Sequence, residues 1–238
     1  ISYDPAFGYE LGHIVKDGLR RMYGENSENV YYYLTVYNEP YQQPAEPENL
    51  DVESLLKGIY LLKKPLRWRR KKVALLASGV AVNWAIKAQK LLNDDFGIAA
   101  TIYSVTSWNE LRRDGLAVDR HNLLNPDKKV SAFITKKLKK ESGPVIAVSD
   151  FMRSVQDQIA PWVSQPFYSL GTDGFGLSDT RGALRRHFKV DAESIAVAAL
   201  SQLHKEGLVS KRKVKKAISK YQINDVTAAE AGNTEGSG

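Results

Sequence analysis

A glycine-rich loop at 170–181 is the most distinctive polar stretch of the chain. Its sequence, LGTDGFGLSDTR, places three glycines around an aromatic residue and then offers several caps for a following helix. Asp173 and Arg181 could form an ion pair across the turn. Because loops on rigid scaffolds often carry function, this loop is a candidate active-site entrance or subunit interface, but a conformationally demanding turn explains its glycines equally well. The candidate residues are Asp173, Phe175, Ser178, Asp179 and Arg181.

Two shorter polar turns follow apolar runs. Ser78 and Gly79 come just before a helical pattern, where backbone N–H groups and the helix dipole favour anions. This turn lacks the three-glycine dinucleotide pattern and the phosphate-loop lysine, so tight turning at Gly79 is the simpler explanation. Ser107 and Glu110 have the S-x-x-E spacing of a helix capping box, which we favour over a ligand-binding role.

Composition excludes or disfavours several chemistries. The chain has no cysteine, which excludes disulfides, iron–sulfur clusters and thiolate zinc sites. The sequence contains no G-x-S-x-G elbow for a nucleophilic serine. None of the four histidines has a partner at a metal-ligand spacing such as H-x-x-x-H; they are His13, His121, His187 and His204. These patterns therefore predict no metal site formed by the histidines, and they leave a Ser–His–carboxylate triad as an unsupported alternative.

The net charge of +7 and the pI near 9.3 make nucleic acid a partner to consider. The positive charge is concentrated at 67–72, 136–140 and 211–216, and two of these runs have helical apolar spacing. Solvated helix faces are therefore the simpler interpretation, and nucleic-acid binding is the less favoured one. No apolar run approaches the length of a membrane span and no secretory signal is recognisable, so we expect a cytoplasmic protein without a membrane partner.

The elements that would position these loops alternate between short apolar strands and amphipathic helices. A helix at 5–23 precedes an aromatic and β-branched run at 30–37, which predicts a strand buried on much of both faces. Further strands are expected near 73–77, 99–105, 145–148 and 167–170, and helices near 80–92, 108–124, 131–140, 151–159, 178–188, 191–206 and 210–220. This alternation predicts an α/β fold with a mainly parallel sheet and helices on both faces.

The predicted organisation has four parts. Residues 1–43 contain a leftover helix–strand pair, and a proline-rich linker covers 44–65. A short helix is expected within the linker at 51–57, followed by a short apolar stretch at 59–62. A complete α/β domain follows at 66–222, and the small polar residues at 223–238 predict a disordered tail. Ile1 runs at once into a helical pattern, so we expect the sequence to be a piece of a longer protein.

Seven motifs, in order and over nearly the whole chain, resemble the homodimeric-type decarboxylating component of pyruvate dehydrogenase. They are SYDPAFGYE at 2–10, RRMYG at 20–24, VYYYLTV at 30–36, YSVTS at 103–107, ELRRDG at 110–115, GTDGFG at 171–176 and SDTR at 178–181. The phrase DVTAA at 225–229 is similar to the actinobacterial branch. One segment departs from the family pattern, because the run at 63–72 is more basic than the family's linker into its third domain.

The resemblance implies a transketolase-like enzyme with three α/β domains per subunit. Residues 1–43 would then end the middle domain, which holds the pyrimidine ring, and 66–222 would be the transketolase-like C-terminal domain. The intact homodimer would decarboxylate pyruvate with thiamine diphosphate and magnesium. It would pass the acetyl unit to a lipoyl group on the dihydrolipoyl acyltransferase of the pyruvate dehydrogenase complex.

The same resemblance implies that this chain alone lacks the residues that carry out the reaction. The family anchors the diphosphate and magnesium with Gly-Asp-Gly and a later pair of asparagines, and neither occurs here. We therefore expect a structural and dimer-forming part that binds no cofactor by itself. The alternatives are a basic module that binds nucleic acid or an acidic partner protein, and a transketolase-like enzyme acting on another 2-oxo acid or a sugar phosphate.

Overall fold

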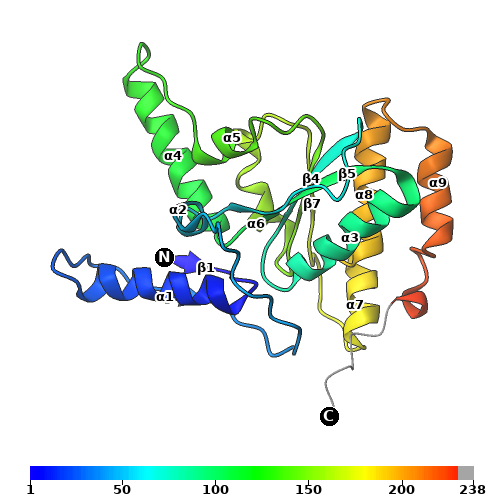
Figure 1. Ribbon diagram of the computed structural model, residues 1–238, viewed down its shortest axis with the longest axis horizontal. Helices are drawn as coiled ribbons and strands as arrows, with labels where there is room; N and C mark the ends of the chain where they lie inside the picture. Colours follow the sequence, from blue (N-terminus) through cyan, green and yellow to red (C-terminus); the bar gives the residue numbers. More distant parts are fainter. Residues whose placement is uncertain (230–238) are drawn as a thin grey trace.

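A computed structural model of the protein describes residues 1–229. Within these residues the centre is a five-stranded sheet with the strand order β3-β5-β4-β6-β7 (Figure 1). Strands β5, β4, β6 and β7 are parallel, and β3 pairs with β5 in the antiparallel sense. The strands are β3 (Tyr60–Lys63), β4 (Lys72–Ala77), β5 (Ala99–Ser104), β6 (Val145–Val148) and β7 (Phe167–Leu170). The predicted mainly parallel sheet is confirmed.

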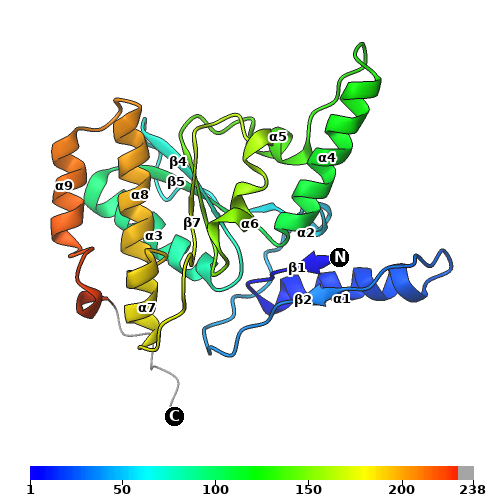
Figure 2. The same ribbon diagram turned by 180° about the vertical axis from the view of Figure 1, so that it is seen from behind.

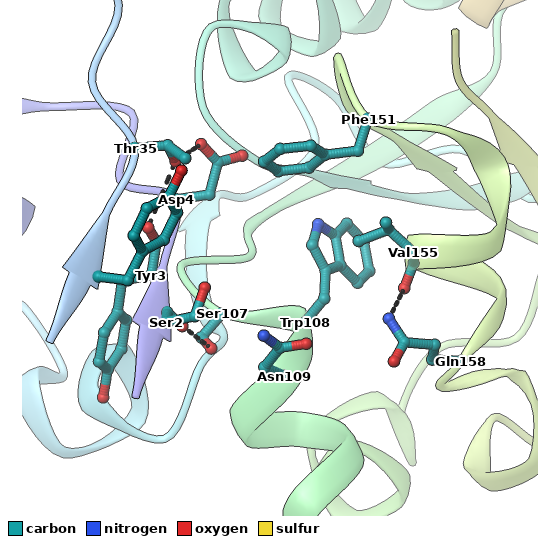
Figure 3. Close-up of a pocket in the computed structure, with 11 residues that line it drawn as sticks. Ser2, Tyr3, Asp4, Thr35, Ser107, Trp108, Asn109, Phe151, Val155 and Gln158 are labelled. Carbon is teal, nitrogen blue, oxygen red and sulfur yellow. Dashed lines mark hydrogen bonds between the residues drawn. The ribbon is translucent and has the colours of Figure 1, made fainter. Parts of the chain in front are cut away.

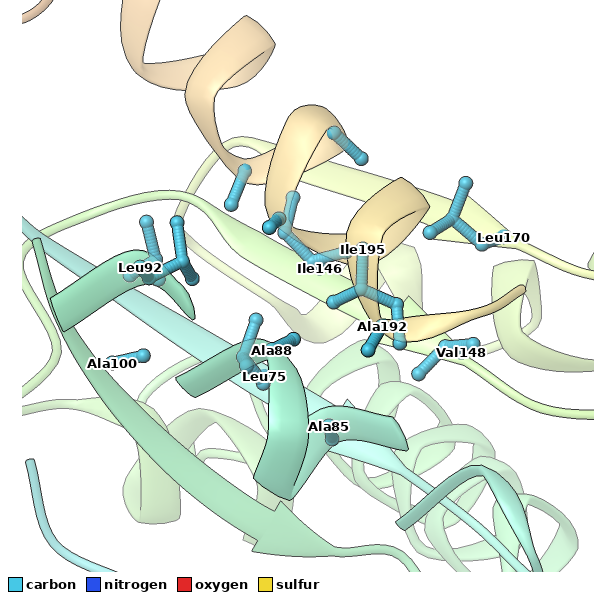
Figure 4. Packing of buried hydrophobic residues seen from close by; sticks show 14 of the residues in the cluster. Leu75, Ala85, Ala88, Leu92, Ala100, Ile146, Val148, Leu170, Ala192 and Ile195 are labelled. Atoms are coloured by element: carbon cyan, nitrogen blue, oxygen red, sulfur yellow. The ribbon is translucent and has the colours of Figure 1, made fainter. Parts of the chain in front are cut away.

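Helices cover both faces of the sheet, as predicted (Figures 1 and 2). One side carries α3 (Ala81–Phe96), α7 (Arg181–Phe188), α8 (Ala192–Lys205) and α9 (Lys211–Lys220), and the other carries α4 (Trp108–Leu124), α5 (Phe133–Leu138) and α6 (Arg153–Asp157). Leu75 packs on the α3 and α8 side (Figure 4), whereas its neighbours Ala74 and Leu76 pack on the α4 and α5 side. Because both faces are covered, β4 is apolar at every buried position.

The N-terminal segment forms a separate small sheet. Its elements are β1 (Ser2–Tyr3), α1 (Gly8–Tyr23) and β2 (Tyr33–Leu34), with β1 and β2 parallel. The predicted strand over 30–37, buried on both faces, is therefore wrong. Only two of those residues are paired, and Tyr33 and Val36 are 62% and 72% exposed. The physical reason is that, within the described residues, β1 is the only strand that pairs with it.

Two boundaries also differ from the prediction. Within the expected linker at 44–65, the short helix predicted at 51–57 is confirmed as α2 (Val52–Leu56). The linker ends earlier than expected, because β3 hydrogen-bonds along β5 as an edge strand of the main sheet. The expected disordered tail at 223–238 begins too early, since Ile223 is buried and a 3-10 turn spans Val226–Ala228. Residues 230–238 lie outside the described residues. No helix within residues 1–229 has the length and apolar character that a membrane span requires.

Two helical glycines provide a matched test of this packing. At Gly115 in α4, an added Cβ would lie 2.4 Å from the Trp162 ring, whereas at Gly12 in α1 it would meet no atom within 4 Å. We expect Gly115→Ala to lower the free energy of unfolding by about 1–3 kcal/mol, because the ring must move. Gly12→Ala should raise it by about 0.5–1 kcal/mol through helix propensity. Urea unfolding measures both, and a stabilised Gly115→Ala would contradict the close contact between α4 and Trp162.

Candidate functional site

The carboxyl ends of the parallel strands are covered by the N-terminal segment of the same chain. In parallel α/β sheets this edge is where ligands usually bind. Here the Asp4 N–H donates to the Thr106 carbonyl at 2.7 Å, just beyond β5. The Ser107 hydroxyl donates to the Ser2 carbonyl at 2.5 Å. Figure 3 shows this junction, which leaves a cleft of about 170 Å³ beside Asp4 and Ser107.

The turn before α3 is filled by the same segment. The Gly79 N–H donates to the Asp4 carbonyl at 3.1 Å, and the Ala81 N–H donates to the Ser78 carbonyl at 3.2 Å. Gly79 has a φ of +53°, and an added Cβ would lie 2.1 Å from the hydroxyl oxygen of Tyr37. Glycine is therefore required by both the turn and the close approach. The tight-turn interpretation is confirmed, because these N–H groups already have partners in the protein.

The Asp4 side chain fixes the N-terminal segment at this edge. Its Oδ1 accepts hydrogen bonds from the Thr35 hydroxyl at 2.5 Å and the Tyr37 hydroxyl at 2.8 Å. Asp4 is only 5% exposed. Burial raises the pKa of its carboxyl, and the hydrogen bonds from Thr35 and Tyr37 oppose that rise. Asp4 thus joins the β1 end to the segment after β2 through its carboxyl, and to the α3 turn through its backbone carbonyl.

Glu10 forms a second buried link, from the first turn of α1 to the main sheet. Its Oε1 accepts from the Ser104 hydroxyl at 2.6 Å and the Tyr60 hydroxyl at 2.7 Å. Its Oε2 accepts from the backbone N–H groups of Ala6 at 2.5 Å and Phe7 at 3.2 Å. Glu10 is fully buried, and burial raises its pKa against the four hydrogen bonds that favour the ionised form.

A third link joins the segment after β2 to α7. Arg185 binds the Glu39 carboxylate with both terminal nitrogens, the longer contact joining Nη1 to Oε1 at 3.1 Å. Asp150, which follows β6, lines the same cavity of about 330 Å³. Burial raises the pKa of Asp150 to about 6; Arg185 opposes this rise, and the charges of Asp4 and Glu39 add to it.

The predicted ion pair between Asp173 and Arg181 is wrong. Asp173 Oδ1 instead accepts from the backbone N–H of Arg153 at 2.9 Å, where it caps the start of α6. Arg181 Nη2 donates to Asn38 Oδ1 at 3.3 Å. The two side chains therefore bind different neighbours. Asp173 binds the start of α6, and Arg181 binds Asn38 in the segment after β2.

The other loop candidates remain at the surface. Phe175 is 95% exposed between Gly174 and Gly176, and Ser178 is exposed as well. Asp179 Oδ1 accepts from the Thr180 N–H, and Thr180 is the residue that caps α7. In α4 the predicted Ser107 cap is confirmed, since its hydroxyl accepts from the Glu110 N–H at 3.0 Å.

The residues that make the junction were missed by the sequence analysis. A signal existed for Glu10, because Glu10, Ile14 and Gly18 are spaced by four residues along the buried face of α1. Asp4 and Asp150 carried no comparable signal, because their burial depends on segments that are distant in sequence.

The described residues do not fit the thiamine diphosphate that the resemblance implies for the intact enzyme. Diphosphate needs free N–H donors and a magnesium site, but the donors of the α3 turn are bound to protein carbonyls. Within residues 1–229 no group of three acidic or histidine side chains is placed to hold a metal ion. We expect calorimetry with thiamine diphosphate and magnesium to show no magnesium-dependent binding by this chain. A micromolar, magnesium-dependent heat signal would contradict this expectation.

Two family models match the chain. Residues 58–191 match the transketolase-like C-terminal domain, and residues 1–44 match the middle domain of the pyruvate dehydrogenase E1 component. The chain is 54% identical to the pyruvate dehydrogenase E1 component of Mycolicibacterium smegmatis over 96% of its length, and 49% identical to that of Mycobacterium tuberculosis over 99%. The Escherichia coli K12 protein is 44% identical over 94%. In each case the chain spans about 25% of the relative's length.

Solved transketolases share the fold. One from Pichia stipitis, in complex with a sugar phosphate, aligns over 88% of this chain and 27% of its own, with a TM-score of 0.56 and 21% identity. One from Campylobacter jejuni aligns over 84% of this chain and 26% of its own, with a TM-score of 0.56 and 20% identity. The chain therefore belongs to the transketolase-like family, in the branch of the pyruvate dehydrogenase E1 components.

Proposed function

We propose that this chain serves as the C-terminal part of an acetyl-transferring pyruvate dehydrogenase, with a structural and dimer-forming role. The observation that carries the proposal is the closed carboxyl edge of the sheet. There, Asp4 and Glu10 fix the N-terminal segment in the position where related folds bind ligands. The identity to E1 components over nearly the whole chain supports the same role.

The whole enzyme would have the activity that the family implies. It would be a cytoplasmic homodimer that decarboxylates pyruvate with thiamine diphosphate and magnesium, and it would transfer the acetyl unit to a lipoyl group of the dihydrolipoyl acyltransferase. The residues of this chain would supply no group to that chemistry. Their part would be to hold the middle and C-terminal domains in a constant relative position.

We also propose the domain division stated above, with 1–43 in the middle domain and 66–222 in the C-terminal domain. The matches of the two family models at 1–44 and 58–191 support it. The loop at 171–181 would face an active-site entrance or another subunit, and the exposed Phe175 suits such a contact. The comparisons give no support to a basic binding module as the main function of the chain.

A chimera tests the proposed function. This chain would replace the matching C-terminal quarter of the Mycolicibacterium smegmatis E1 component, to which it is 54% identical. We expect the chimera to form a dimer and to decarboxylate pyruvate at a rate within about tenfold of the parent. A chimera carrying Glu10→Ala should lose dimer stability. A well-folded dimeric chimera that binds cofactor but has no activity would overturn the proposed structural equivalence.

A further inference from the structure

Two of the three basic runs converge on one surface. The run at 67–72 leads into β4, and the Ala99 N–H that follows α3 donates to the Lys71 carbonyl at 3.0 Å. α9 reaches the same end of α3, because Lys213 Nζ donates to the Phe96 carbonyl at 3.2 Å and Lys220 Nζ lies 2.5 Å from Asp95 Oδ1. Figures 1 and 2 show α9 beside this end of α3. We call residues 67–72 and 211–220 the basic surface.

The net positive charge of the basic surface is larger than that of the whole chain. It carries five cationic side chains at 67–72 and six at 211–220. Asp95 offsets one of them through its ion pair with Lys220, whereas Asp94 pairs with Lys90 outside this surface; the surface therefore carries +10, against a net +7 for the chain. The remainder of the protein is thus slightly acidic. An imbalance this strong attracts an acidic partner and steers its approach.

Few of these cationic side chains form ion pairs within the protein. Within residues 1–229 only Lys220 of the eleven cationic side chains has a carboxylate within ion-pair distance, and the other ten have none. The charges of the basic surface are therefore available to a partner.

The first turn of α9 adds an independent observation. Lys211, Arg212 and Lys213 all lie there, and the turn contains no acidic residue. The helix dipole places partial positive charge at this end, so cations there are unfavourable and an anion is favoured. A partner with carboxylates would neutralise both the side chains and the exposed end of the dipole.

The apolar residues of this surface indicate a polypeptide rather than a nucleic acid. Leu66 and Trp68 are 54% and 80% exposed beside the first run, and Ile218 is 36% exposed on α9. Binding of single strands uses several aromatic side chains for stacking, but Trp68 is the only exposed tryptophan, phenylalanine or tyrosine at 67–72 and 211–220. We propose that the basic surface binds an acidic polypeptide segment that also carries apolar side chains.

Fluorescence anisotropy with a labelled peptide of glutamate and leucine tests this proposal on the full chain. Two double variants reverse charges on the two halves of the surface, Arg70→Glu with Lys71→Glu and Arg212→Glu with Lys215→Glu. A matched control, Lys128→Glu with Lys129→Glu, makes the same charge change at exposed residues in the loop after α4. We expect each surface variant to weaken peptide binding at least about tenfold and the control less than about twofold. Binding should also weaken as salt increases.

Three results would overturn the proposal. They are no peptide binding at low salt, equal weakening by the control variant, and tighter binding of duplex DNA than of the peptide at the same salt. Thermal unfolding shows whether a variant binds more weakly only because it is less stable. The Arg212→Glu, Lys215→Glu variant should melt at or above the temperature of the unmodified chain, because an acidic residue at position 212 suits the first turn of the helix and Lys215 is exposed.

Discussion

Replacing Glu10 with alanine is expected to lower the free energy of unfolding by about 3–5 kcal/mol. The substitution removes the shared acceptor of four donors, two of them the hydroxyls of Ser104 and Tyr60. The other two are backbone N–H groups at the start of α1, which cannot be substituted away. Because all four lie in a buried junction, each loses a hydrogen bond without gaining water. Urea unfolding monitored by tryptophan fluorescence measures the loss.

Two further variants separate the hydrogen bonds from the packing of the Glu10 side chain. Glu10→Gln keeps the shape and one acceptor oxygen, so we expect a smaller loss of about 1–3 kcal/mol. Combining Glu10→Ala with Ser104→Ala should cost less than the sum of the two single losses, because they share one hydrogen bond. If Glu10→Ala costs less than about 1 kcal/mol, the N-terminal segment is not held at the sheet by this carboxylate.

The main sheet could be predicted from the sequence because its signals are local. Each strand from β4 to β7 is a short apolar run followed by a helical pattern, so that alternation alone indicated crossovers and a parallel sheet. Ser107 is a similar case, since the capping hydroxyl and the N–H group of Glu110 that donates to it lie three residues apart. Element ends differed from the prediction by a few residues, as at α3, which extends to Phe96.

The junction could not be predicted in the same way because its contacts join distant parts of the chain. The hydrogen bond from Ser104 to Glu10 spans 94 residues, and the ion pair of Arg185 with Glu39 spans 146. The four-residue spacing of Glu10, Ile14 and Gly18 indicates a buried face of α1, but nothing near Glu10 in sequence identifies Ser104 and Tyr60 as its partners. The prediction of a buried strand at 30–37 was wrong for a different reason. Its composition indicated burial, but the described residues supply one neighbouring strand and leave Tyr33 exposed.

The ionised form of the Asp150 carboxyl is disfavoured in the folded protein. It lies beyond β6, in the cavity lined by Glu39 and Arg185. Burial raises its pKa from 3.8 to about 6; Arg185 opposes the rise, while Asp4 and Glu39 add to it. In the unfolded chain the carboxyl ionises near its ordinary pKa, so between pH 4 and pH 6 the folded state binds more protons. The contribution of Asp150 to stability is therefore fully present below that range and decreases as the pH rises through it.

Asp150→Asn should therefore stabilise the protein, and the gain should depend on pH. The amide keeps the size of the side chain and cannot ionise, so the cost of burying the charge disappears. At pH 8 we expect the free energy of unfolding to rise by about 3 kcal/mol, and near pH 4 we expect a difference close to zero. Urea unfolding of both proteins across this range measures the difference in their free energies of unfolding. The contributions of the other titrating groups drop out of this difference, because both proteins share them. A variant that is less stable than the parent at pH 8, by a margin that grows with pH, would contradict this account. In that case the attraction between Asp150 and Arg185 would exceed the cost of burial, and the folded state would favour the ionised carboxylate.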